Sequence, residues 1–138
     1  METDSAPRVL IRQGDEIDIA MDEDPAEVRR VRRAVVAAVR SDDIEPTRLQ
    51  EALIAISELV SNALVHGGPP RRVRLSLASQ GLLVEVFDGS LRRPHLVHTA
   101  ASEPGGHGLQ LVAQLATDWG TTPCTDGKWV WCLIGFTR

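Results

Sequence analysis

Apolar residues recur at helical spacing in the first third of the chain. The stripe consists of Val28, Val31, Val35 and Val39. The segment Asp24-Pro25-Ala26-Glu27 precedes it and places an acidic residue, a proline and a glutamate where they favour a helix start. We therefore expect a helix that begins near residue 25. Its arginines lie off the stripe and are expected to be solvated: Arg29, Arg30, Arg32 and Arg33.

A second helix, from Pro46 to about His66, is predicted to be apolar on two sides. Pro46 suits a first helical turn, and Gly67-Gly68-Pro69-Pro70 ends the pattern. The side expected to face a sheet carries Leu49, Leu53, Ile56, Val60 and Leu64. The opposite side carries Ile54, Glu58, Asn62 and Val65. Two polar residues four positions apart therefore share a partly apolar helix face.

Alternating patterns predict short strands in three regions. These are residues 8–21 around a Gly14-Asp15 turn, 72–78 and 82–87 around a turn at 79–81, and 118–136 around a turn at 125–127. A third helix is expected after Gly108, and residues 89–106 show no period, as is typical of a functional loop. Because helices and strands do not alternate, we expect an α+β two-layer sandwich: a mixed β-sheet with helices packed on one face.

Composition narrows the possible classes of protein. The 138 residues suit one domain, which we expect over residues 8–138 after a flexible tail at 1–7. A net charge of −4 and few aromatic residues give no sign of nucleic-acid binding. Cys124 and Cys132 fit no disulfide framework or zinc site. The sequence shows no secretion signal and no apolar run of membrane-spanning length, so we expect a cytoplasmic protein.

Glu58 and Asn62 are the first candidates for chemistry. A carboxylate and an amide on a partly apolar face are costly unless a ligand or side chain pairs with them. Their oxygens are hard ligands of the kind that Mg²⁺ accepts together with phosphates and water. The alternative is an ordinary solvent-facing pair, and the helix alone does not decide between the two.

Two further motifs follow along the chain. Asp88 ends the predicted strand 82–87, where a carboxylate can accept a hydrogen bond from an amino group of a ligand; an aspartate before glycine is also a common turn. The run Gly105-Gly106-His107-Gly108-Leu109 enters the third helix. Glycines and a free helix N-terminus suit phosphate binding, although the run is neither a Walker loop nor a Rossmann fingerprint.

The words SELVSNALVHGG, VEVFDGS and GGHGLQLV, in this order, resemble the N, G1 and G2 boxes of the GHKL (Bergerat-fold) ATPases. The chain is most similar to the stand-alone anti-sigma-factor serine/threonine kinases of the short actinobacterial type. The closing words ATDWG and GKWVW also resemble that subgroup, so that the resemblance covers about residues 8–136.

The resemblance implies a site for ATP and Mg²⁺. It implies that Glu58 is the catalytic general base, that Asn62 holds Mg²⁺, that Asp88 reads adenine N6 and that residues 91–104 form an ATP lid. The remaining implied nucleotide-binding residues are Ser90, Gly106, His107, Gly108 and Leu109. It also implies a sigma factor and an anti-anti-sigma antagonist as partners, and homodimers in several members.

Two positions depart from the family pattern. Ser90 stands where a second glycine is common, and Trp129 stands where a threonine often shares the adenine site. Two functions therefore stay open: a serine/threonine kinase that is also an anti-sigma factor, and a non-catalytic module that sequesters a partner. The catalytic piece of a histidine kinase is a weaker third. His95 and His98, three apart, lack the further ligands of a zinc site.

Overall fold

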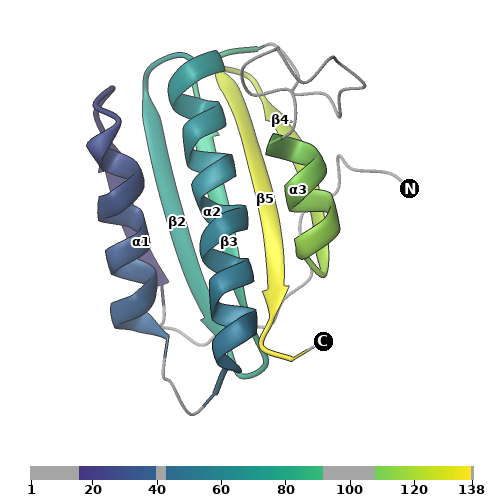
Figure 1. Cartoon of the computed structure of the whole chain (residues 1–138). Helices are drawn as coiled ribbons and strands as arrows, with labels where there is room; N and C mark the ends of the chain where they lie inside the picture. Colours follow the sequence, from purple (N-terminus) through teal and green to yellow (C-terminus); the bar gives the residue numbers. More distant parts are fainter. Residues whose placement is uncertain (1–15, 40–42, 92–107, 138) are drawn as a thin grey trace.

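Three helices cover one face of a five-stranded sheet in the part of the chain that the computed structural model describes, residues 16–39, 43–91 and 108–137 (Figure 1). The elements are β1 (Glu16–Met21), α1 (Ala26–Ala38), α2 (Pro46–His66), β2 (Arg71–Ala78), β3 (Gly81–Asp88), α3 (Gly108–Leu115), β4 (Asp118–Cys124) and β5 (Gly127–Gly135). The two-layer α+β prediction is confirmed. Residues 1–7, predicted as a tail, lie outside the described ranges.

The sheet differs from the prediction in the direction of its strands. Its order is β1-β2-β3-β5-β4, and all four neighbouring pairs of these described strands are antiparallel. The expectation of a mixed sheet was therefore wrong. β3 and β4 do run in the same direction, but the β4–β5 hairpin folds so that β5 lies between them and pairs with both.

α1 begins where the sequence predicts, with a local cap. The Ala26 amide donates a hydrogen bond of 2.8 Å to the Asp24 carboxylate. Val31 and Val35 are fully buried, as the apolar stripe requires. The expectation that the arginines of α1 are solvated was wrong for Arg32. Its guanidinium donates to the Leu53 carbonyl oxygen at 3.2 Å and to Ser57 Oγ at 2.8 Å, and these hydrogen bonds connect α1 to α2.

α2 lies across the middle of the sheet, between α1 and α3 (Figure 1). Its predicted sheet-facing side is confirmed at Leu53, Ile56 and Val60, which are all buried. On the opposite side, Ile54 and Val65 are 43% and 66% exposed. One side of α2 therefore packs in the core, while the other side is largely accessible to solvent.

The sheet face opposite the helices carries a second, smaller set of apolar side chains. Leu83, Phe87 and Trp131 are buried but do not belong to the main core cluster. Trp129 lies on the same face, with its ring 5.3 Å from that of Phe87 and 4.6 Å below the Arg74 guanidinium. Since alternate residues of a strand point to opposite faces, Lys128 and Val130 point toward the helices.

Arg48 links the start of α2 to the end of the chain. Its guanidinium donates to the carbonyl oxygens of Gly135 at 2.8 Å and Leu115 at 2.6 Å, and to Thr117 Oγ1 at 3.2 Å. Glu51 lies 3.3 Å away and balances its charge. The side chain is buried, so these acceptors depend on it for their hydrogen bonds.

We expect Arg48→Met to lower the free energy of unfolding by about 3 kcal/mol, because it leaves the buried carbonyl oxygens of Gly135 and Leu115 without the donor that Arg48 supplies. Arg33→Met, on the exposed side of α1, should change it by less than about 0.5 kcal/mol. Urea unfolding followed by circular dichroism measures both. Equal effects would show that the buried contacts of Arg48 contribute no stability.

Candidate functional site

α2 carries Glu58 and Asn62 one turn apart on its outer side. Both side chains are half-buried, and neither makes a hydrogen bond or ion pair with any residue of the described ranges. Polar groups in such a setting are available to a ligand. The two residues lie four positions apart on one helix, as the sequence predicts.

The start of α3 lies against Glu58. A Cβ atom built on Gly108 would lie 3.0 Å from Glu58 Oε2, so the N-terminus of α3 and the carboxylate are close neighbours. Two motifs that are 50 positions apart in the sequence thus meet. Leu109 is buried in the core, so its side chain packs and does not line the site.

Asp88 lies at the end of β3, where the α2–β2 connection passes over it. A Cβ atom on Gly67 would lie 2.6 Å from the Asp88 Cγ and 2.6 Å from the Ala63 carbonyl oxygen, so no side chain fits there. The Gly89 amide donates to the Gly68 carbonyl oxygen at 2.7 Å. The Ser90 amide donates to Asp88 Oδ1 at 2.8 Å. Asp88 is 3% exposed, and these contacts hold its carboxylate in one place.

Lys128 is a site residue that the sequence analysis missed. It pairs with Asp88 across β3 and β5, and its ammonium donates to Asp88 Oδ1 at 2.9 Å and to the Ser90 carbonyl oxygen at 3.3 Å. Trp129, which the sequence analysis singled out as the departure next to adenine, points to the other sheet face and does not reach Asp88. Strand alternation could have shown that Lys128, one position earlier, shares the face of Asp88.

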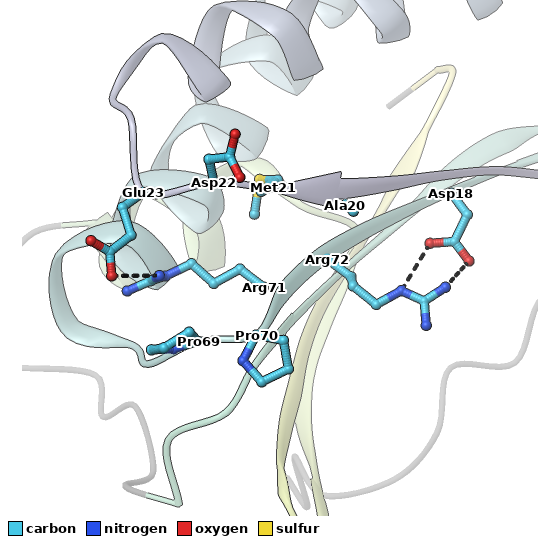
Figure 2. A pocket seen from close by; sticks show the side chains of 9 residues that line it. All are labelled: Asp18, Ala20, Met21, Asp22, Glu23, Pro69, Pro70, Arg71 and Arg72. Atoms are coloured by element: carbon cyan, nitrogen blue, oxygen red, sulfur yellow. Dashed lines mark hydrogen bonds and ion pairs between the residues drawn. The ribbon is translucent and has the colours of Figure 1, made fainter.

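Arg71 holds the connection that passes over Asp88. Its guanidinium donates to the carbonyl oxygens of Ala63 at 2.9 Å and Gly67 at 3.0 Å, which caps the end of α2. Figure 2 shows the Arg71 side chain reaching Glu23, with the nitrogen and oxygen 3.5 Å apart. The open pocket drawn there lies beside the edge formed by β1 and β2, and its lining includes none of the predicted site residues.

Several predicted residues lie outside the described ranges, namely Gly106, His107, His95, His98 and most of the predicted lid. Among the residues that are described, no three His, Cys, Asp or Glu side chains come close enough to hold a metal. No helix in these ranges is long and apolar enough to cross a membrane. Cys124 and Cys132 are both free, and burial raises the pKa of Cys132 to about 12.

Comparison with known proteins identifies the family of the chain. The family model of the histidine kinase-like ATPase domain matches residues 21–132, which include Glu58, Asn62, Asp88 and Lys128. The chain belongs to the histidine kinase-like ATPase domain family. ATP binding is what this family implies.

One solved structure with the family fold is the crystal structure of the RsbU and RsbW domains of Rv1364c from Mycobacterium tuberculosis. It matches with a TM-score of 0.64 and 18% sequence identity, over 86% of this chain and 31% of that one. At this identity the likeness shows the fold alone, and this chain spans less than a third of that structure. No curated protein matches the chain.

Gly67→Ala should lower the free energy of unfolding by about 2 kcal/mol, because the added methyl group overlaps Asp88 and the Ala63 carbonyl. Gly68→Ala is the matched control, since its Cβ would meet nothing closer than 3.7 Å. Thermal unfolding of the two variants checks the difference. If both were tolerated equally, the close approach of the connection to Asp88 would be refuted.

Proposed function

We propose that this chain binds Mg·ATP and transfers the γ-phosphoryl group to a serine or threonine of an anti-anti-sigma antagonist, and that it also binds a sigma factor. The observation that carries the proposal is the contact between Glu58 and Gly108. The Glu58 carboxylate has no partner among the described residues, and it lies beside the N-terminus of α3. Phosphoryl transfer needs a group that positions the attacking hydroxyl close to bound phosphates, and a helix N-terminus suits phosphate binding.

Glu58 would orient the attacking hydroxyl and accept its proton. The carboxylate is half-buried and lies at the edge of the site, within reach of a protein substrate that approaches the outer side of α2. The first amide groups of α3 would stabilise the charge on the phosphate oxygens, because those groups lack partners within the helix. Positioning and charge stabilisation are the main contributions that phosphoryl transfer needs from a protein.

Asn62 would hold the magnesium ion. Its amide is half-buried one turn from Glu58 and pairs with no described residue, so an oxygen is free to act as a ligand. Mg²⁺ commonly takes one or two protein oxygens and fills its other positions with phosphates and water, which suits so small a donor set. When bound, the ion would neutralise phosphate charge, and Asp88 would accept a hydrogen bond from adenine N6.

The proposed partners rest on the family resemblance of the sequence, and the likeness to the RsbW-containing structure is consistent with them in fold. RsbW is named in that structure beside RsbU, in a chain of which this one covers 31%. A sigma factor and its antagonist are the proposed protein partners, with homodimers and a cytoplasmic location as further parts of the proposal. The substrate hydroxyl would come from the antagonist.

Thermal unfolding with and without Mg·ATP tests nucleotide binding. Wild type should be stabilised in a magnesium-dependent way, by about 2.7 kcal/mol at a hundredfold excess of ligand over Kd. Asn62→Ala should lose most of this gain, whereas its neighbour Ser61→Ala should keep it. A wild-type protein that millimolar Mg·ATP does not stabilise would contradict the proposal.

Glu58→Gln tests catalysis separately from binding. The variant keeps the shape of the side chain but cannot accept a proton, so phosphate transfer to co-purifying proteins should fall by at least about a hundredfold while Mg·ATP still binds. Labelled ATP measures the transfer. If wild type binds Mg·ATP and transfers no phosphate, the kinase proposal fails, and a partner-binding module that uses ATP replaces it.

A further inference from the structure

The buried pair of Asp88 and Lys128 has hydrogen-bonding capacity that the described residues do not use. The two hydrogen bonds that described residues donate to the carboxylate, from the Ser90 amide and the Lys128 ammonium, both end on Oδ1. Within the described ranges, Oδ2 has no donor. An ammonium group has three N–H donors, and only two of them have acceptors among these residues, Asp88 Oδ1 and the Ser90 carbonyl oxygen.

The unused oxygen and the unused N–H donor belong to a carboxylate and an ammonium group that are in direct contact. The Nζ and Oδ1 atoms are 2.9 Å apart, and both side chains are less than a tenth exposed. The glycine connection over Asp88 and the bond from Lys128 to Ser90 fix them relative to β3 and β5. A fixed acceptor beside a fixed donor is complementary to a ligand edge that presents a donor beside an acceptor.

Adenine has such an edge, with the N6 amino group as donor and N1 as acceptor. We propose that Lys128 is a second residue that recognises the base: its ammonium donates to N1 while Asp88 accepts from N6. This inference rests on the proposed nucleotide binding and extends it to base specificity. Lys128 is the chain's only lysine, and a charged donor strengthens the hydrogen bond that it makes.

The competing role is purely structural. A buried ion pair that only joins β3 to β5 would affect stability and would leave the affinity for N1-modified bases unchanged. Breaking such a pair also leaves a buried charge without a partner, so loss of binding in a lysine variant alone would not separate the two roles. A ligand that lacks N1 separates the structural role of Lys128 from its role in base recognition, because the protein itself is left unaltered.

The test compares ADP with 1-deaza-ADP, in which a carbon replaces N1 and the N6 amino group remains. Isothermal titration calorimetry with Mg²⁺ should show wild type binding 1-deaza-ADP at least about tenfold more weakly than ADP, because a charged hydrogen bond is lost. Lys128→Met should bind ADP more weakly and distinguish the two ligands by less than about twofold. Trp129→Phe, on the opposite face, should keep the wild-type ratio.

Two results would overturn the role of Lys128 in base recognition, and a third would overturn nucleotide binding itself. Equal affinity of wild type for the two ligands would overturn the role of Lys128 and leave nucleotide binding intact. A Lys128→Met variant that folds and keeps the full wild-type ratio would overturn it as well. If wild type bound neither ligand, the proposed nucleotide binding would fail and the role of Lys128 with it. If Lys128→Met failed to fold, the wild-type ratio would decide alone.

Discussion

The space between Gly67 and the Asp88 carboxylate is too small for a methyl group, and the arrangement of the site depends on this close approach. The end of α2 must pass over the end of β3 without a side chain. Arg71 fixes the connection by donating to the carbonyl oxygens of Ala63 and Gly67. In consequence, the end of α2, the helix that carries Glu58 and Asn62, is fixed against the Asp88 carboxylate at the end of β3, as the proposed nucleotide site requires.

The two sides of α2 differ in burial. Its sheet-facing side supplies fully buried residues such as Ile56 and Val60 to the core, which fixes the helix on the sheet. Its outer side leaves Val65 exposed and Glu58 without a described partner, an arrangement that contributes little to folding. The proposed function therefore uses the side of the helix that contributes little to stability, and the core on the other side keeps the helix rigid.

Local sequence patterns predicted the helices and strands well, because the spacing of apolar residues and the residue types in turns depend on only a few neighbouring positions. The predicted bounds of α2 agree with the structure, and the turns after β2 and β4 lie where Gly81 and Gly127 indicated. The sheet was wrongly predicted to be mixed, and the position of Lys128 beside Asp88 was not predicted, since both depend on which strands become neighbours. The i, i+4 spacing located Glu58 and Asn62, but no local signal showed that Gly108 would lie against Glu58.

Mapping amide chemical shifts during a titration with Mg·ADP tests the central claim most directly. The account predicts that the largest changes cluster around Asn62, Gly67, Asp88, Gly108 and Lys128, which come from four different elements and the α2–β2 connection and meet only in the fold. Residues of the opposite sheet face, such as Trp131, should change little. Changes confined to the β1–β2 edge beside the pocket of Figure 2, or no changes at all, would contradict it.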